Sequence, residues 1–364
     1  MHLFADLLNP PVQAIVRSVP APSPVPTATF TNANTPKRTS PWRTIGKTLL
    51  QNATSDPAQA IVQAGLNWSV ERVDLRCADT LDPVPDFAAI RRSDTSALLG
   101  VVDPDYTPLQ NSQMFGFFTD LANAGPDGKE VPFPIETAGS FQGGKTVWAL
   151  AHLPDLGIRL GDDEAKTYLL ISNGHTGNKL LTVAPTTIRV ICQNTLTMAE
   201  AQAKENRRRP GLSGGFTVRH TPGMLEAIDE IREAYVATLA NHKATKGAWK
   251  HLAGVPLTKS LEDRFKTTVF GKAGPDESDR AQTIRKNRDE RLAAILASPT
   301  SQVRGTKDTA FSLLHAVVEW VDHDRSTRAG EGGNATEQRL ASSTYGSGAD
   351  LKARAWDAIL ELTA

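Results

Sequence analysis

Hydrophobic and polar residues alternate through the middle of the chain, in short runs that polar turns separate. A period of two places every second side chain on one face of a strand, whereas a period near 3.6 marks a helix. Residues 167–196 hold three strand-like runs, and the turn between the first two contains Gly174, Gly177 and Asn178. We expect a β-meander here, with runs at 168–171, 180–183 and 187–191, and a helix that begins within residues 192–196.

The residues before the meander predict the rest of a sheet. Strands are expected at 68–76, 87–91, 98–102, 135–141 and 146–153, and helices at 56–64 and 111–121. Gly143 and Gly144 separate the last two strands. Paired glycines readily adopt the positive φ values of a tight turn, so these two strands should form a β-hairpin. Together the elements predict an antiparallel sheet with two helices on one side.

Beyond Asn194 the hydrophobic period becomes helical. Apolar residues at steps of three and four predict a helix at 224–242, and further helices are expected at 257–270, 279–296, 309–323 and 351–362. The fold class is therefore α+β, with an antiparallel β-sheet and packed helices in the N-terminal half and a mainly helical C-terminal half. Residues 329–336 contain three glycines and should form a surface loop.

These patterns divide the chain into three parts. Residues 19–40 are rich in Pro, Thr, Ser and Asn without apolar periodicity, so we expect 1–40 to be a flexible N-terminal segment. An α+β sheet domain should cover 41–196. Residues 197–364 should form a helical region that packs on the sheet domain.

Composition excludes several classes of protein. The 364 residues include 40 Lys and Arg and 40 Asp and Glu, so no net charge attracts the whole molecule to nucleic acid or to an anionic membrane. Cys77 and Cys192 are the two cysteines, too few for a disulfide framework or a thiolate metal site. No apolar run approaches the roughly 18 residues of a membrane span. We expect a cytoplasmic protein that does not associate with membranes.

Two short stretches of the meander carry a family resemblance. They read Leu-Ile-Ser-Asn-Gly-His at 170–175 and Arg-Val-Ile-Cys-Gln-Asn-Thr-Leu at 189–196. These two sequences resemble those of the phage/plasmid-like protein family, a prokaryotic mobile-element family catalogued as a domain of unknown function. Similar landmarks occur at 41–46, 64–70, 106–111, 136–150 and 316–323, so the resemblance covers about 41–362. The chain departs from the family at Arg43, where His is more usual, and any role of that His does not carry over.

A nucleotide-binding motif is present in sequence. Residues 139–146 match the phosphate-binding pattern Gly-x-x-x-x-Gly-Lys-Thr, in which Lys145 and Thr146 would contact phosphates and Mg²⁺. That loop must open a helix, yet residues 147–151 are bulky and strand-like. The context favours the β-hairpin. A P-loop-like nucleotide-dependent enzyme that uses Lys145 and Thr146 remains an alternative.

Metal and covalent chemistry have weaker signals. His315, Glu319, Asp322 and His323 could share one helical face, but a single helix rarely completes a coordination shell, so a solvated or core-capping face is the preferred interpretation. Cys192 has no adjacent cation that would lower its pKa, and the chain has no Gly-x-Ser-x-Gly motif. We therefore predict no catalytic residue, no metal and no cofactor, and we favour a binding protein over an enzyme.

Local basic residues supply the remaining hypothesis. A positive groove with nearby aromatic rings suits single-stranded nucleic acid, because cations hold phosphates and rings stack on unpaired bases. The candidate phosphate contacts are Lys145, Arg159, Lys166, Lys179, Arg189, Arg207, Arg208 and Arg209, and the candidate stacking rings are Trp148 and Tyr168.

The predicted layout is also similar to the single-strand annealing proteins of phage recombination. This similarity implies an ATP-independent single-stranded DNA-binding or annealing protein of a phage or plasmid, with single-stranded DNA as its partner and a homo-oligomeric state. The alternatives are the nucleotide-dependent enzyme and a non-enzymatic protein-interaction or regulatory factor of a mobile element.

Overall fold

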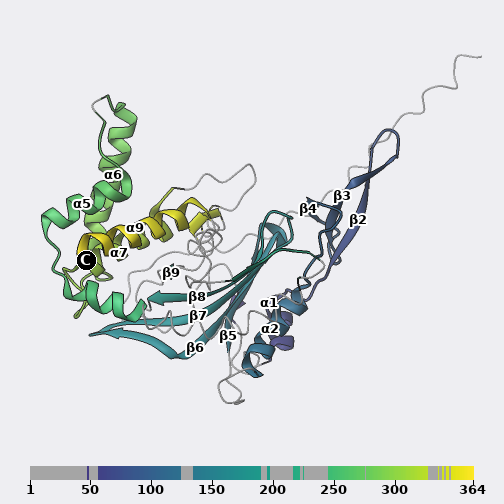
Figure 1. Cartoon of the computed structure of the whole chain (residues 1–364), viewed down its shortest axis with the longest axis horizontal. Coiled ribbons are helices and arrows are strands. Elements are labelled where there is room, and N and C mark those ends of the chain that lie inside the picture. Colours follow the sequence, from purple (N-terminus) through teal and green to yellow (C-terminus); the bar gives the residue numbers. More distant parts are fainter. Residues whose placement is uncertain are drawn as a thin grey trace, which may run out of the picture. The chain divides into compact units, whose positions relative to one another are not determined.

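The structure is a computed structural model of the chain (Figure 1). It describes residues 47–48, 56–123, 134–189, 195–196, 216–221, 224, 245–274, 276–326, 335, 338–339, 342–343 and 346–364, all within the unit Pro36–Ala364. The predicted N-terminal segment 1–40, Arg207, Arg208, Arg209 and most of the helix expected at 224–242 lie outside these residues.

A seven-stranded antiparallel sheet forms the larger part of the described N-terminal half, with the order β1-β5-β6-β7-β8-β10 and β9 paired to β8 (Figure 1). The strands are β1 (Lys47–Thr48), β5 (Ile135–Phe141), β6 (Thr146–Leu160), β7 (Asp163–Gly174), β8 (Leu181–Arg189), β9 (Thr195–Leu196) and β10 (Phe216–Val218). The predicted antiparallel sheet is confirmed. Because β10 also joins it, the sheet extends past the predicted domain end at Leu196.

Two details of the predicted meander are wrong. Residues 181–189 form one strand instead of two runs, since the ladder with β7 continues through the pair Leu169–Pro185. A proline is tolerated in a ladder where its nitrogen faces away from the partner strand. Thr195 and Leu196 belong to strand β9 and not to a helix, because they pair with Ile188 and Thr187 of β8.

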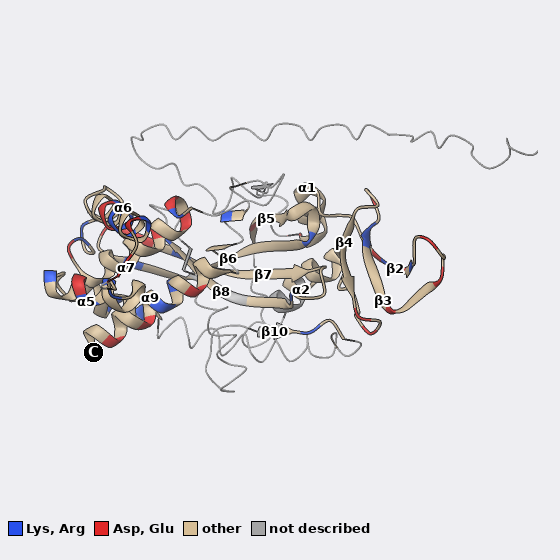
Figure 2. Ribbon diagram, turned by 90° about the horizontal axis from the view of Figure 1, so that it is seen from above, with Lys and Arg blue, Asp and Glu red and all other residues tan. Residues whose placement is uncertain are grey.

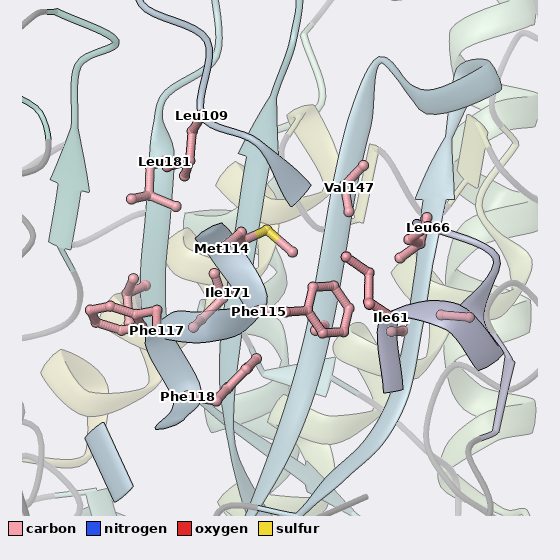
Figure 3. Packing of buried hydrophobic residues seen from close by; sticks show 14 of the residues in the cluster. Ile61, Leu66, Leu109, Met114, Phe115, Phe117, Phe118, Val147, Ile171 and Leu181 are labelled. Carbon is pink, nitrogen blue, oxygen red and sulfur yellow. The ribbon is translucent and has the colours of Figure 1, made fainter. Parts of the chain in front are cut away.

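Helices α1 (Pro57–Ala64) and α2 (Asn111–Asn123) pack on one face of the large sheet, as the sequence predicts (Figure 3). Asp56 begins α1 by accepting hydrogen bonds from the N–H groups of Ala58 and Gln59, and Gly65 ends the helix at a φ of 70°. The apolar side chains of α2 meet those of β6, β7 and β8. The residues at this contact include Met114, Phe115, Phe118, Val147, Ile171 and Leu181.

A separate three-stranded antiparallel sheet consists of β2 (Val70–Arg76), β3 (Pro83–Arg92) and β4 (Leu98–Val102). The sequence predicts these strands but not their separation from the large sheet. Glycines allow the three-stranded sheet and the turn after β7 to approach closely. A Cβ atom on Gly100 would stand 2.7 Å from the Cα of Thr176, and one on Gly177 would stand 3.0 Å from Val102.

The described C-terminal half is helical, as predicted. A helix spans 245–254, followed by α5 (Lys259–Phe270), α6 (Asp279–Leu296), α7 (Ala310–Glu319), the π-helical segment η3 (Trp320–Asp324) and α9 (Ser347–Thr363). Their buried side chains form one hydrophobic cluster that includes Trp249, Phe265, Phe311 and Trp356. Ile158 and Ala165 of the large sheet belong to the same cluster. The cluster therefore joins the helical half to one end of β6 and β7.

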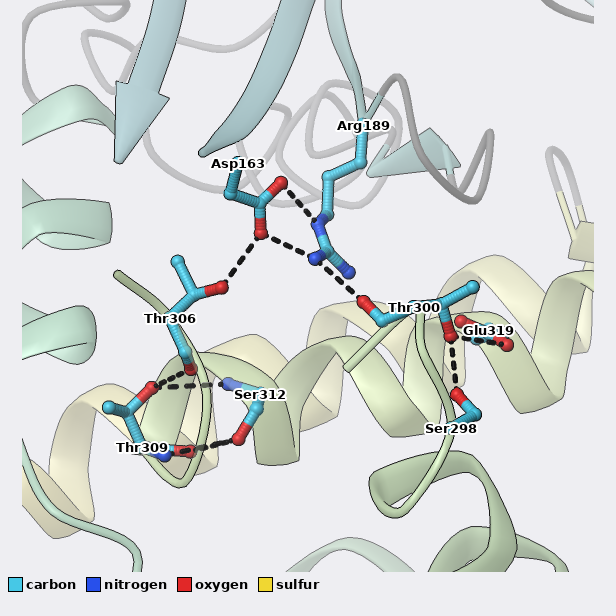
Figure 4. A network of polar contacts seen from close by, with 8 residues as sticks. All are labelled: Asp163, Arg189, Ser298, Thr300, Thr306, Thr309, Ser312 and Glu319. Atoms are coloured by element: carbon cyan, nitrogen blue, oxygen red, sulfur yellow. Dashed lines mark hydrogen bonds and ion pairs between the residues drawn. The ribbon is translucent and has the colours of Figure 1, made fainter. Parts of the chain in front are cut away.

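A buried ion pair lies at this junction (Figure 4). Arg189 of β8 donates from Nε to Asp163 Oδ1 at 3.1 Å, and its Nη2 bonds both Asp163 and the carbonyl oxygen of Thr300. Asp163 also accepts from Thr306 Oγ1 at 2.9 Å. The two charged side chains are 1% and 3% exposed, so the strands and the segment before α7 share one desolvated network.

Within the described ranges, no helix combines the length and the apolar character that crossing a membrane requires.

Candidate functional site

The Gly-x-x-x-x-Gly-Lys-Thr motif lies in a β-hairpin. Phe141 of β5 pairs with Thr146 of β6, and one turn of 3-10 helix, η2 (Gln142–Gly144), joins the strands. Gln142, Gly143 and Gly144 have φ values of 51°, 69° and 106°. No helix follows the turn, so its N–H groups do not form the phosphate cradle of a nucleotide-binding loop. The predicted hairpin is confirmed.

Three segments that carry the family resemblance meet beside this hairpin. We define the strand-end cluster as Trp68, Tyr106, Asn111, Asn173 and His175, which come from the loop before β2, the segment before α2, the start of α2, and the end of β7. Asn111 Nδ2 donates to the carbonyl oxygens of Leu66 and Trp68, at 3.0 and 3.1 Å.

Further hydrogen bonds connect the cluster to the end of β7. The Tyr106 hydroxyl donates to the carbonyl oxygen of Gly174 at 2.9 Å, and Asn173 Nδ2 donates to that of Leu109 at 3.1 Å. His175 Nε2 lies 3.1 Å from Asn111 Oδ1. Polar side chains thus connect the end of β7 to the start of α2 and to the segment that precedes it.

Two histidines of this region are held neutral. Burial lowers the pKa of His175 to about 3, and the nearby His220 and Arg92 act in the same direction. Burial also lowers the pKa of His220, whose ring stacks on Tyr106 at 4.8 Å between centroids. His175 Nδ1, His220 Nε2 and Asn173 Oδ1 are buried without a hydrogen-bond partner among the described residues. Such atoms give the cluster unused bonding capacity.

Arg92 ties the hairpin turn to the three-stranded sheet. Its guanidinium lies 4.1 Å from the centroid of the Trp68 ring and donates from Nη1 to the carbonyl oxygen of Gly143 at 2.8 Å. Asp94 balances the charge, with Nε–Oδ1 and Nη2–Oδ2 distances of 2.9 and 2.6 Å. The hydrogen bonds from Arg92 lower the pKa of Asp94. Arg92 therefore connects the hairpin turn to the three-stranded sheet, and its charge is balanced by Asp94 and not available to an external anion.

Three other basic residues lie along one end of the large sheet. Lys145 precedes β6, Lys179 lies in the turn before β8, and Arg219 follows β10. The pairs Thr146–Gly174 and Leu181–Val218 place these three positions at the same end of neighbouring strands. We call Lys145, Lys179 and Arg219 the strand-end cations. Lys179 Nζ donates to Thr146 Oγ1 at 2.7 Å, and neither Lys145 nor Arg219 has a carboxylate partner among the described residues.

Several predicted contact residues lie elsewhere. Arg159 pairs with Glu164 at 3.3 Å on the surface, and Lys166 lies 3.6 Å from Glu136. The Tyr168 hydroxyl donates to the same Glu136 at 2.9 Å. Arg159 and Lys166, which were expected to contact phosphates, are therefore paired with carboxylates.

The predicted stacking rings do not face solvent. Trp148 is 0% and Tyr168 2% exposed, and both belong to a buried cluster with Phe141, Leu150 and Leu170. A base cannot stack on a ring that the protein covers. These side chains lie on the face opposite α1 and α2, and this face is covered as well, which the sequence does not reveal. Arg189, buried with Asp163, is likewise no contact for an external phosphate.

The helical face considered for a metal has other partners. His315 is fully buried against Phe311, with ring centroids 4.3 Å apart, and this burial lowers its pKa well below the usual value. Glu319 accepts from Thr300 Oγ1 at 3.1 Å, and Asp322 accepts from Lys352 Nζ at 2.8 Å. The part of the chain that the structure describes holds no group of three or more His, Cys, Asp or Glu suited to a metal ion.

Sequence reasoning found Lys145 and Lys179 but not Arg92 or Arg219. Arg219 follows a three-residue strand, too short for a pattern to reveal, and Arg92 ends a strand that looks ordinary in sequence. The family resemblance was a signal for the strand-end cluster, because its segments at 64–70, 106–111 and 170–175 supply the residues of that cluster.

The architecture is that of an α+β protein with an antiparallel sheet, helices on one sheet face, and a helical C-terminal half. Residues 98–344 match the model of a family described as Domain of unknown function (DUF932), and the chain belongs to that family. No curated protein and no solved structure matches the chain significantly.

Proposed function

We propose that this protein binds single-stranded DNA without ATP and promotes annealing of complementary strands. One observation carries the proposal: Lys145, Lys179 and Arg219 stand in a row at one end of the sheet, and no described carboxylate neutralises Lys145 or Arg219. Three strand spacings separate β6 from β10, so the row extends over about 14 Å. A basic row of this kind binds a phosphate backbone electrostatically.

The surroundings of the row favour contact with phosphates over contact with bases. Trp68 and Tyr106 lie at the same end of the sheet but are 6% and 7% exposed, so they offer little ring surface for stacking. Phosphate contacts fix a strand without reading its sequence. Bases that point away from the protein stay free to pair, which is what annealing of two strands requires.

The expected biological setting belongs to the same proposal. The resemblance to phage/plasmid-like proteins and to single-strand annealing proteins suggests a cytoplasmic protein of a mobile element. The chain has no net charge, so attraction to DNA would be local and would weaken steeply with salt.

Fluorescence anisotropy with a labelled single-stranded oligonucleotide across a salt series tests the binding site. Three phosphate contacts predict a slope of log K against log salt of about −2, from roughly 0.7 per contact on single strands. Changing Lys145, Lys179 and Arg219 together to Gln should remove most of this slope and the affinity. The matched control changes Lys246, Lys250 and Lys307 to Gln, three exposed cations of the helical half, and should leave both unchanged.

A second assay follows annealing of complementary oligonucleotides with and without ATP. We expect annealing in both, and loss of annealing in the strand-end triple variant. Equal weakening by the control variant, or weak unsaturable retention of DNA by the wild type, would refute the proposal. The second result would instead favour a protein-interaction or regulatory factor.

A further inference from the structure

The outer edge of β2 in the three-stranded sheet offers main-chain groups for pairing. Among the described strands, β2 pairs only with β3. At Val70 the outer edge is occupied by a side chain, because the Gln110 amide accepts from the Val70 N–H at 3.0 Å and donates to the Val70 carbonyl oxygen at 3.1 Å. Gln110 thus imitates a neighbouring strand for one residue.

The ladder shows which residues come next along this edge. The N–H of Ser93 donates to the carbonyl oxygen of Ser69 at 2.9 Å, so Ser69 faces β3 while Val70 faces away. Main-chain direction alternates along an antiparallel strand. Arg72 and Asp74 therefore also direct their N–H and C=O groups away from β3, and no described residue pairs with them. The regular ladder ends after Asp74, where the register shifts.

The side chains of this edge are self-complementary. Charged residues of both signs gather on β2 and β3 (Figure 2). Arg72 and Asp74 are exposed, lie on one face of the sheet, and have no ion-pair partner among the described residues. In an antiparallel pair of identical strands centred on residue n, residue n − 1 stands opposite n + 1 of the other copy. Centring on Val73 places Arg72 opposite Asp74 twice.

We propose that two copies of this chain pair through β2 in antiparallel orientation about a two-fold axis at Val73. The four outward N–H groups of Arg72 and Asp74 in the two copies would donate across the axis, and two Arg72–Asp74 ion pairs would fix the register. The two small sheets become one continuous sheet. This inference does not depend on DNA binding.

Neighbouring registers fit less well. Centring on Asp74 would oppose Arg72 and Arg76, two like charges that destabilise a cross-strand pair. Centring on Arg72 would require the main chain of Val70, which Gln110 occupies. The Val73 register also extends an apolar face, since Val73 pairs with Ala89 and Ala89 with Val101, which is 56% exposed. A second copy would place its own Val73 beside this face.

Analytical ultracentrifugation over a range of concentrations tests the pairing. We expect a wild-type dimer. Asp74→Arg opposes two pairs of like charges and should weaken dimerisation at least about tenfold, whereas combining it with Arg72→Asp should restore it. Asp74→Pro removes an outward N–H that the β2–β3 ladder does not use, so it should abolish the dimer and leave cooperative unfolding intact. The control Asp276→Arg reverses an exposed charge elsewhere and should change nothing.

Crosslinking checks the register itself. In a Cys77→Ser background, Val73→Cys should oxidise rapidly to a covalent dimer, because non-hydrogen-bonded residues that face each other across strands have Cα atoms about 4.5 Å apart. Leu75→Cys should not, since its counterpart in the other copy is then four residues away along the strands. A monomeric wild type, or assembly that survives Asp74→Pro unchanged, would overturn the inference.

Discussion

The buried Arg189–Asp163 pair allows a quantitative prediction about how the helical half is attached to the sheet. Asp163→Asn keeps the shape of the side chain but removes the carboxylate that pairs with the buried guanidinium of Arg189. The two side chains are 1% and 3% exposed, so water cannot compensate for the lost charge. Removing one partner of a buried pair costs about 3–5 kcal/mol of unfolding free energy.

The double variant Asp163→Leu with Arg189→Met separates charge from packing. The double variant removes both charges of the pair, so its loss should be smaller than the sum of the losses of Asp163→Leu and Arg189→Met measured singly, with a coupling energy of about 2 kcal/mol or more. Urea unfolding followed by tryptophan fluorescence measures the wild type, these two single variants, the double variant and Asp163→Asn. The adjacent pair Asp162–Arg304 supplies the control, because both side chains are largely exposed and Arg304→Ala should change the stability little.

The reasoning fails if Asp163→Asn costs less than about 1 kcal/mol, or if the two single losses simply add. Either result would mean that the network in Figure 4 is solvated or loosely formed in solution. It would also return Arg189 to the set of side chains that could reach an external phosphate.

Three further predictions follow from single positions. The pKa of His175 is about 6.5 in the unfolded chain and about 3 in the fold, so the unfolded chain binds the proton more readily. The contribution of neutral His175 to the free energy of unfolding is therefore complete above pH 6.5, and at lower pH it falls by at most about 1.4 kcal/mol per pH unit. Between pH 7 and pH 5, the free energy of unfolding should fall less for His175→Gln than for the wild type. Gly100→Ala should destabilise by about 1–3 kcal/mol because its Cβ meets the backbone of Thr176, whereas Gly116→Ala, in α2 with open space around it, should stabilise by up to about 1 kcal/mol in thermal unfolding. Calorimetric titration with Mg²⁺ and ATP should give no binding heat for the wild type, and a saturable signal lost in Lys145→Ala would contradict the hairpin assignment.

The sequence predicts elements whose signal is local. Helix α1 has a capping Asp56, a proline at its first position and Gly65 after its end, so it is found within one residue. Helix α6 and strand β4 are predicted with their observed bounds. The Gly143–Gly144 turn is equally local, because paired glycines favour a tight turn and strand-forming residues follow them, whereas a nucleotide-binding loop would open a helix.

Features that depend on distant contacts were not predictable in this way. The continuation of β8 through Pro185 depends on the ladder with β7, and the strand at Thr195 depends on its partner in β8. Burial of Trp148 depends on what covers the second face of the sheet. Alternation reports that a residue faces one side of a sheet, but it does not report whether that side is open.

The same distinction explains the candidate site. Lys145 and Lys179 could be named from sequence, but only strand order shows that they share one end of the sheet with Arg219. Lys166 and Arg159 looked equivalent to Lys145 in sequence, but Glu136 lies beside Lys166 and Glu164 beside Arg159 in space. Whether a cation is available for a phosphate is decided by its nearest carboxylate. That quantity belongs to the tertiary structure, which is why the row of strand-end cations, and not the number of basic residues, supports the proposed function.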